Sequence, residues 1–391
     1  MCINKISIMP KKHIALIMPL STYDWGSNNC GGVDSVCQML AEYMVNHDDA
    51  NYRFTIIGLD PQSKTPFTGD VIHLSDNVDF IWLPASSKQS KFKIPGIIWQ
   101  NWHVRKLLKI LNPDLVHTHL WSLLVGSCYE GKTLVTVHSY KKIARRNVGL
   151  VNDFLYEKII PSITARRNDN VVVVGKQLQS AIIADGFKSE VVHNPINQEY
   201  FEANYAKHNR KEVKLVTCAL LTPRKKVEDS VALLAKLVSD GFDSSLAIIG
   251  PATDKEYTQR IKKQVVSLGL ENNVTFFGKL NKAQIIQQYT NADLGVFTSG
   301  EETFGLVPLE MLAVGLPLIT TKVGILEDER LFFEGIGVQY FTNTLTSESV
   351  NNLIKNHDVN KSKSTLETKF NIACVFEQYL DLYSKTIDEV E

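Results

Sequence analysis

Two glutamates, Glu302 and Glu310, are the residues whose spacing most directly suggests chemistry. They flank the start of an apolar helical pattern within residues 298–315, and an apolar strand pattern at 292–297 precedes them. A strand, an acidic turn and a helix start form the arrangement with which open α/β sheets hold ligands at the carboxyl ends of their strands. Glu310, about one turn into the helix, could accept two hydrogen bonds from the hydroxyl groups of a ribose. An acidic cap on a core helix would explain the two glutamates equally well.

The start of the same helix is also a candidate anion site. Its first backbone N–H groups have no partner inside the helix and the helix dipole favours negative charge, so the expected ligand is a phosphate. Pro308 is compatible with this position, because a missing N–H in the first turn costs no hydrogen bond. Glu302 would then lie nearer to whatever is attached beyond the phosphate. The residues around this helix start are Thr303, Phe304, Gly305 and Leu306.

Two cations, Arg224 and Lys225, form a second group. They follow Pro223 and lie between a strand pattern at 213–219 and a helical pattern at 227–238, which Pro223 is expected to open. Cations at such a strand-to-helix crossing are well placed to neutralise a diphosphate. A solvated surface charge is the alternative explanation for either of them.

Three histidines occur in two apolar strand patterns, His117 and His119 within 114–121 and His138 within 134–139. The carboxyl ends of parallel strands meet at one edge of a sheet, so His119 and His138 are expected to face the same crevice. His117 is expected on the opposite face from His119, as a hydrogen-bonded structural residue.

Gly31 and Gly32 stand between a polar loop and a helical pattern. A glycine pair at such a turn permits a diphosphate or a sugar to approach the backbone amides closely. Glycine pairs are also frequent in ordinary turns.

The elements that must position these residues follow from the hydrophobic pattern. Residues 14–18 form a continuous apolar run, as expected for a parallel strand covered on both faces, and strand patterns then alternate with helical ones. The alternation predicts an α/β fold with a doubly wound parallel sheet. The first run, although preceded by lysines, is too short for a signal peptide and breaks at Pro19. No segment approaches the roughly 20 apolar residues of a membrane span.

Composition narrows the class of protein. The 391 residues suffice for two or three domains, and 42 Lys and Arg balance 42 Asp and Glu, so nucleic acid is not an expected partner. The six cysteines show neither C-x-x-C nor a metal-type spacing with histidine. Reduced thiols are therefore expected rather than a disulfide framework or a zinc site.

A basic and aromatic stretch covers residues 88–109, where six lysines and arginines are interleaved with residues such as Trp99 and Trp102. This composition suits a surface that contacts anionic lipid headgroups. The alternative is a helix that buries its tryptophans while its lysines are solvated. A second basic and amphipathic stretch covers residues 141–167.

In their order along the chain, these motifs resemble the retaining glycosyltransferases of the GT-B fold, specifically glycosyltransferase family 4. Residues 298–315 are similar to the nucleotide-sugar signature of the family, E-x7-E with an internal F-G-L-V-P-L. The other similar motifs are G-G at Gly31 and Gly32, H-x-H ending at His119, T-x-H ending at His138, P-R-K from Pro223 to Lys225, and V-x-F-x-G ending at Gly278. The resemblance extends from Gly31 to Tyr383.

The resemblance implies a GT-B fold of two Rossmann-like, doubly wound domains that face a central cleft. Residues 1–197 would form the acceptor-side domain and 198–369 the nucleotide-sugar-binding domain. A C-terminal helix in 370–391 would pack back on the first domain.

The resemblance also implies the roles of individual residues. Catalytic roles fall to Glu302, His119, His138 and Lys225. Donor-binding roles fall to Gly31, Gly32, Arg224, Lys225, Gly278, Thr303, Phe304, Gly305, Leu306 and Glu310. No metal and no cofactor are implied, since the donor, a UDP- or GDP-sugar, is a substrate. The family has G-R where this chain has Ala219 and Leu220, so one phosphate ligand is missing.

The implied reaction moves a sugar from a nucleoside diphosphate to a hydroxyl of a glycan or lipid-linked acceptor. Bacterial surface polysaccharide (O-antigen, capsule or lipopolysaccharide) is the expected product. The expected location is the cytoplasm, at the inner face of the membrane, which 88–109 and 141–167 would contact. Two alternatives stay open: a non-catalytic nucleotide-sugar-binding partner subunit, suggested by Leu220, and a nucleotide-sugar epimerase of the same fold.

Overall fold

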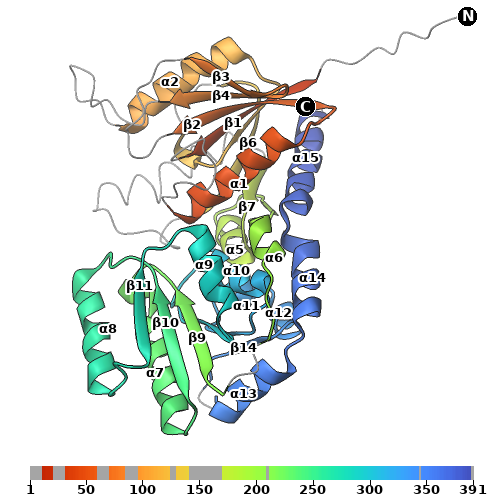
Figure 1. Cartoon of the computed structure of the whole chain (residues 1–391). Coiled ribbons are helices and arrows are strands. Elements are labelled where there is room, and N and C mark those ends of the chain that lie inside the picture. The colour runs from red at the N-terminus through yellow and green to blue at the C-terminus, as the bar shows by residue number, and fades with distance from the viewer. Residues whose placement is uncertain are drawn as a thin grey trace, which may run out of the picture. The chain divides into compact units, whose positions relative to one another are not determined.

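The computed structural model describes residues 11–20, 31–59, 70–83, 96–123, 129–140, 170–207, 211–342 and 345–388. Internal contacts divide the chain into two compact α/β units (Figure 1). Unit 1 comprises Met1–Val174, Gln179–Val192 and Phe376–Glu391, and unit 2 comprises Gly175–Leu178 and His193–Val375. None of the described helices is both long enough and apolar enough to cross a membrane.

Unit 1 is built on one sheet with the strand order β3-β4-β2-β1-β5-β6-β7-β8 among its described residues. Every neighbouring pair is parallel except β3 and β4, which are antiparallel. The strands are β1 (Lys12–Pro19), β2 (Tyr52–Leu59), β3 (Val71–Ser75), β4 (Val78–Leu83), β5 (Leu115–Thr118), β6 (Lys132–Val137), β7 (Asn170–Val173) and β8 (Glu190–Val191). The apolar run predicted as the first strand is β1, whose central residues are fully buried.

The helices described in unit 1 include one that comes from the far end of the sequence. They are α1 (Gly32–Asn46), α2 (Gly96–Leu111), the 3-10 turn η1 (Trp121–Leu123), α5 (Lys176–Ala184) and α15 (Ile372–Asp388). α5 and α15 each begin in unit 2 and continue in unit 1. In unit 1, the ring of Phe376 on α15 lies 5.9 Å from that of Phe54 on β2. The end of the chain therefore completes the core of unit 1.

Unit 2 is built on a parallel sheet with the strand order β11-β10-β9-β12-β13-β14. Its strands are β9 (Val213–Cys218), β10 (Ser244–Ile249), β11 (Val274–Gly278), β12 (Leu294–Phe297), β13 (Leu318–Thr320) and β14 (Val338–Tyr340). Its helices are α6 (Gln198–Glu202), η3 (Pro223–Lys225), α7 (Val227–Ser239), α8 (Lys255–Ser267), α9 (Lys282–Thr290), α10 (Leu306–Val314), α11 (Ile325–Asp328), α12 (Arg330–Glu334), α13 (Ser347–Asn356) and α14 (Val359–Phe370). Apolar side chains of α7 and α8 cover β9, β10 and β12 and form its core.

α10 is the central helix of unit 2 and is short, apolar and buried. Glycines define both of its ends: Gly305 precedes it with φ 97° and Gly315 follows it with φ 114°. Such left-handed conformations suit glycine, which has no Cβ to clash. A side chain at Gly315 would also meet Val359 at 2.7 Å. The sequence thus fixes where the helix that carries Glu310 begins and ends.

Pro223 differs from its predicted role. It opens the separate 3-10 turn η3, and α7 begins only after Lys226, which adopts a left-handed φ of 45°. The two cations Arg224 and Lys225 therefore belong to their own turn rather than to the first turn of α7.

Candidate functional site

The acidic turn before α10 is hydrogen-bonded to the turn that carries the two cations. The Thr298 hydroxyl donates to the carbonyl of Lys225 at 3.0 Å, and the Gly300 N–H donates to the carbonyl of Arg224 at 2.8 Å. Both turns follow the carboxyl ends of adjacent strands, β12 and β9. The structure thus brings together two groups that are about 75 positions apart in the sequence.

Within this assembly, the Lys225 ammonium group donates a hydrogen bond to the Glu302 carboxylate. The side chains are only 13% and 12% exposed. Removing two charges from water is costly, and their mutual attraction offsets that cost only while both partners are present. The two residues therefore form one charged unit, and a ligand that binds one of them changes the surroundings of the other.

Arg224 differs from Lys225. It is exposed, and no ion pair among the described residues involves its guanidinium group. Leu220, at the position where the resemblance places an arginine, is 43% exposed. Arg224 is therefore the cation of this turn that is accessible to an anion.

The helix start offers the predicted amides. Within the described chain, no hydrogen bond joins the N–H groups of Phe304, Gly305 or Leu306 to another residue, whereas the Phe304 carbonyl accepts from Ile325 N–H at 2.9 Å. A Cβ at Gly305 would lie 3.9 Å from the Cγ of Glu302, so the open amides and the Lys225–Glu302 pair are neighbours. Together these groups can hold a phosphorylated ligand.

Glu310 lies inside α10, where burial raises the pKa of its carboxyl to about 7. A hydrogen bond from the Tyr200 hydroxyl acts in the opposite direction, as does the positive charge of Lys282. Tyr200 comes from α6 and is itself buried. Near neutral pH, Glu310 is therefore divided between a protonated form and a carboxylate that accepts hydrogen bonds.

Gly278 ends β11 with φ 68°, and its carbonyl accepts from Gly250 N–H at 2.8 Å. It lies at the same carboxyl edge of the sheet as the turn before α10, but on the edge strand. This residue, to which the resemblance assigns donor binding, is thus within unit 2, three strands from β12.

In unit 1, the two predicted site histidines contact each other. His119 Nδ1 lies 2.9 Å from His138 Nε2, and one of the two nitrogens donates. Burial lowers the pKa of His138 to about 4 and that of His119 well below its usual value, so the pair is neutral at physiological pH. His119 Nε2 is buried and has no hydrogen-bond partner among the described residues.

The histidine pair lines a cavity of about 160 Å³. Val33, in the first turn of α1, also lines it, which places the start of α1 and thus Gly32 beside the histidines. The remaining lining residues are Leu120, Trp121, Ser122, Thr136, Val137, Ser139 and Tyr140. The cavity combines hydroxyl groups and neutral imidazoles, which can donate to and accept from a sugar hydroxyl.

The expectation that His117 lies on the opposite face from His119 is wrong. The two rings are 4.6 Å apart, because residues two positions apart in a strand share a face. His117 is nevertheless a buried, hydrogen-bonded residue: its Nδ1 lies 2.7 Å from the Tyr383 hydroxyl and its Nε2 lies 2.8 Å from the Thr136 hydroxyl.

The basic stretches are described only in part. Residues 88–95 and 141–167 lie outside the described residues, whereas α2 covers the rest of the first stretch. α2 buries Asn101, Val104 and Leu108, whereas Ile98 and Trp102 are exposed, with Lys106 Nζ 3.6 Å from the Trp102 ring centroid. Exposed apolar and cationic side chains therefore share the solvent side of this helix.

Two family models match the chain. The model described as Glycosyltransferase Family 4 matches residues 30–200, and the model described as Glycosyl transferases group 1 matches residues 200–363. The two matches follow one another and include every candidate site residue named above.

Individual curated proteins match the chain at low sequence identity. The chain is 23% identical over 251 residues to the O-antigen chain mannosyltransferase RfbU of Salmonella typhimurium. The matched region covers 62% of this chain and 66% of RfbU. In other cases the chain spans about half the length of the curated relatives it matches, 53% in one and 58% in another.

Solved structures resemble the whole chain. Sucrose-phosphate synthase of Thermosynechococcus elongatus superposes with a TM-score of 0.74 at 18% identity and covers 96% of this chain and 99% of its own. HepE of Anabaena, in complex with UDP and glucose, superposes with a TM-score of 0.65 at 16% identity. The superposition covers 95% of this chain and 99% of HepE. These likenesses confirm the predicted fold class, the GT-B fold with two parallel-sheet α/β domains.

Proposed function

Because the chain belongs to glycosyltransferase family 4, we propose that it is a retaining glycosyltransferase that moves a sugar from a nucleoside diphosphate to a hydroxyl of a glycan or lipid-linked acceptor. The observation that carries this proposal is the assembly in unit 2 of the Lys225–Glu302 pair beside the open amides before α10. A site that presents a cation, a carboxylate and free N–H groups at one helix start suits a phosphorylated sugar.

Transfer from such a donor requires stabilisation of the departing diphosphate and of an oxocarbenium-like sugar. Lys225, Arg224 and the amides of Phe304 to Leu306 would bind the diphosphate. Glu302, already held by Lys225, would turn its carboxylate toward the sugar hydroxyls. Glu310 would accept hydrogen bonds from the ribose.

The neutral histidine pair is assigned to a hydroxyl rather than to a phosphate. A neutral imidazole nitrogen can accept or donate one hydrogen bond but offers no charge to an anion. The Nε2 of His119, which has no partner among the residues that the structure describes, supports this assignment, because a buried polar atom without a hydrogen bond is costly unless a ligand satisfies it.

Assembly of a bacterial surface polysaccharide is the proposed setting, because RfbU, a relative, is named as an O-antigen chain mannosyltransferase. Membrane attachment is proposed through the exposed side of α2, where Ile98, Trp102 and Lys106 combine apolar area with positive charge. A UDP- or GDP-sugar is the proposed donor, with UDP supported by the HepE complex.

The test begins with donor binding. Unfolding temperature is measured with UDP-, GDP- and ADP-sugars, since a donor that binds the folded protein raises it by mass action. The best donor is then assayed for transfer to an acceptor, and the anomeric configuration of the product is determined by NMR. Lys225→Ala and Glu302→Ala are compared with Lys255→Ala, an exposed lysine at the start of α8. Full transfer by both site variants would refute this site.

The two alternative functions give different products in the same assay. An epimerase would convert the donor in the absence of acceptor. A non-catalytic partner subunit, which the exposed Leu220 suggests, would show a thermal shift with a nucleotide sugar but neither transfer nor hydrolysis.

A further inference from the structure

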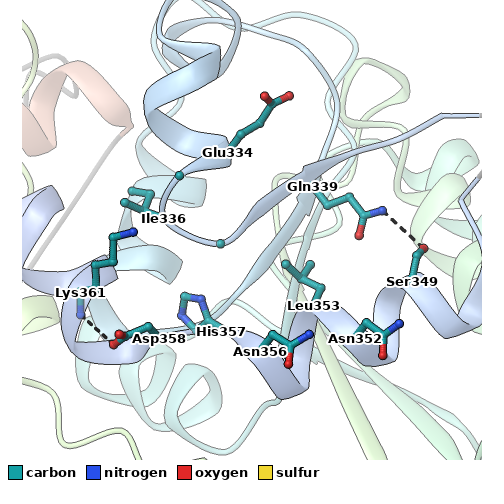
Figure 2. Close-up of a pocket in the computed structure, with 12 residues that line it drawn as sticks. Glu334, Ile336, Gln339, Ser349, Asn352, Leu353, Asn356, His357, Asp358 and Lys361 are labelled. Atoms are coloured by element: carbon teal, nitrogen blue, oxygen red, sulfur yellow. Dashed lines mark hydrogen bonds between the residues drawn. The ribbon is translucent and has the colours of Figure 1, made fainter.

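A second polar pocket lies in unit 2 at the amino ends of the strands, whereas the candidate donor residues lie at their carboxyl ends. It has a volume of about 520 Å³ and is formed where the chain enters β14, between the end of α12 and the helices α13 and α14 (Figure 2). Gly337, which lines it, directly precedes β14, whereas Glu302 follows the carboxyl end of the parallel strand β12. The two sites are therefore at opposite edges of one sheet.

Three primary amides line the pocket. Gln339, Asn352 and Asn356 contribute them, and the Ser349 hydroxyl lies 3.4 Å from the amide nitrogen of Gln339 (Figure 2). Each amide offers both a donor and an acceptor, as each hydroxyl group of a sugar does. Leu353 adds apolar surface between these polar groups, whereas Ile336, which also lines the pocket, is only 4% exposed.

The charges of the lining disfavour an anion. Lys361 is the cationic side chain of the described lining, whereas Glu334 and Asp358 are acidic. Burial lowers the pKa of His357 to about 4, so this histidine adds no positive charge at neutral pH. Among the described residues, no group of three metal-ligating side chains occurs here or elsewhere. A neutral ligand rich in hydroxyl groups fits this combination better than a phosphate or a cation.

The floor of the pocket contacts the helix that carries Glu310. His357 is 5% exposed, and its Nε2 hydrogen-bonds to the carbonyl of Gly315 at 3.0 Å. Gly315 is the residue that ends α10, and Glu310 lies five positions before it. A Cβ at Gly337 would lie 2.1 Å from His357 Nδ1, so the pocket wall is pressed against this histidine.

We propose that this pocket binds a neutral saccharide and is a carbohydrate site separate from the site of transfer. The three amides recognise adjacent hydroxyl groups, the Leu353 side chain contacts the ring carbons, and the volume lies within the range of pockets for small ligands. The proposal rests on the lining groups alone, so it does not require that the protein be a transferase. Its consequence for the transferase is that a glycan bound here lies beside His357, which is hydrogen-bonded to the end of α10.

The experiment uses the full chain and saturation-transfer NMR with glucose, mannose, galactose, N-acetylglucosamine and maltose. The pocket variant is Asn352→Ala/Asn356→Ala, in which both residues are exposed, so that the fold tolerates the change. Asn351→Ala, on the same helix but outside the pocket, is the matched control. Glu302→Ala is the control for sugar bound at the candidate donor site.

The expected result is a signal from at least one saccharide that the pocket variant weakens at least fivefold, and that both controls retain. The absence of a signal with every saccharide would overturn the proposal. So would a signal that Glu302→Ala removes and the pocket variant retains, which would assign the sugar to the candidate donor site instead. Circular dichroism of each variant establishes that a lost signal reflects binding and not unfolding.

Discussion

Lys225 and Glu302 share one hydrogen-bonded ion pair although 77 positions separate them in the sequence. Both belong to the proposed donor site, and the structure describes them bound to each other. The pair sets the orientation of a carboxylate and an ammonium group before any ligand arrives, and such preorganisation lowers the reorganisation that binding requires.

The destabilisations caused by removing each partner alone should therefore add up to more than the destabilisation caused by removing both. In a double-mutant cycle of Lys225→Ala and Glu302→Ala, urea unfolding should give a coupling energy of about 1–3 kcal/mol. The exposed pair of Arg330 and Glu334 on α12 is the matched control, and its coupling should be at most about 0.5 kcal/mol. Equal couplings for the two pairs would show that the Lys225–Glu302 pair is energetically an ordinary surface pair.

The Glu310 carboxyl should make donor binding depend on pH. Its pKa is raised to about 7, so the carboxylate that accepts ribose hydroxyls becomes populated as the pH rises through 7. Donor affinity from calorimetry should increase between pH 6 and 8, and Glu310→Gln should bind weakly without this dependence. A wild-type affinity that is flat over this interval would contradict the assignment.

The same carboxyl should affect stability in the opposite sense. The unfolded chain loses this proton near pH 4.5, whereas the folded protein retains it up to about pH 7. The free energy of unfolding should therefore fall as the pH rises from 4.5 to 7, by up to about 3 kcal/mol at about 1.4 kcal/mol per pKa unit. Glu310→Gln should remove this slope, as measured by urea unfolding across the interval.

The histidine pair should act through hydrogen bonds and not through charge. His119→Ala and His138→Ala should each reduce kcat by about 10- to 100-fold and leave donor affinity unchanged. Burial lowers both pKa values, so neither histidine should titrate near pH 6.5. The wild-type and variant rates should therefore depend on pH in the same way around that value. His73→Gln, an exposed histidine of β3, is the control and should keep the wild-type rate.

A cation introduced at position 220 should strengthen donor binding. Leu220 is 43% exposed, so Leu220→Arg should be tolerated and place a guanidinium group beside the turn of Arg224 and Lys225. The expected gain is about tenfold in donor Kd, or about 1.4 kcal/mol, and it should shrink as salt is added. Leu331→Arg, at an exposed position of α12, controls for added charge. An unchanged Kd would place the diphosphate away from residue 220.

Membrane attachment through α2 should depend on its exposed apolar residues. Ile98→Ser/Trp102→Ser should reduce sedimentation with phosphatidylglycerol vesicles at least fivefold, because these side chains would otherwise enter the interface. Leu331→Ser, which removes an exposed leucine of unit 2, should leave sedimentation unchanged. If the wild-type protein does not sediment with these vesicles, the α2 surface is not a membrane contact.

Hydrophobic patterns predicted most of what is local in this fold. The apolar run at 14–18 and the strand before Glu302 both exist as β1 and β12, because a buried parallel strand reads as an unbroken apolar run. Pro223 was expected to open the helix at 227–238, but it opens η3 instead. The left-handed conformation of Lys226 separates η3 from α7, and no sequence rule requires that conformation of a lysine.

Contacts between distant residues were beyond the sequence. Tyr200 lies in a short helix and has no motif, yet it hydrogen-bonds to Glu310 and helps to set its pKa. No motif in the sequence marks Asn352 and Asn356, because a pocket depends on the residues that pack opposite them. The orientation of His117 was predicted incorrectly, although its burial and hydrogen bonding were anticipated.

The position of α15 has a consequence for how this protein is made. The residues from Phe376 onward belong to unit 1, where Phe376 packs beside Phe54 and Tyr383 hydrogen-bonds to His117. A ribosome synthesises all of unit 2 before it reaches the residues from Phe376 onward. Until then, unit 1 lacks part of its aromatic core. Unit 1 can therefore complete its core only after unit 2 has been synthesised, and the aromatic residues that contact α15 stay uncovered until then.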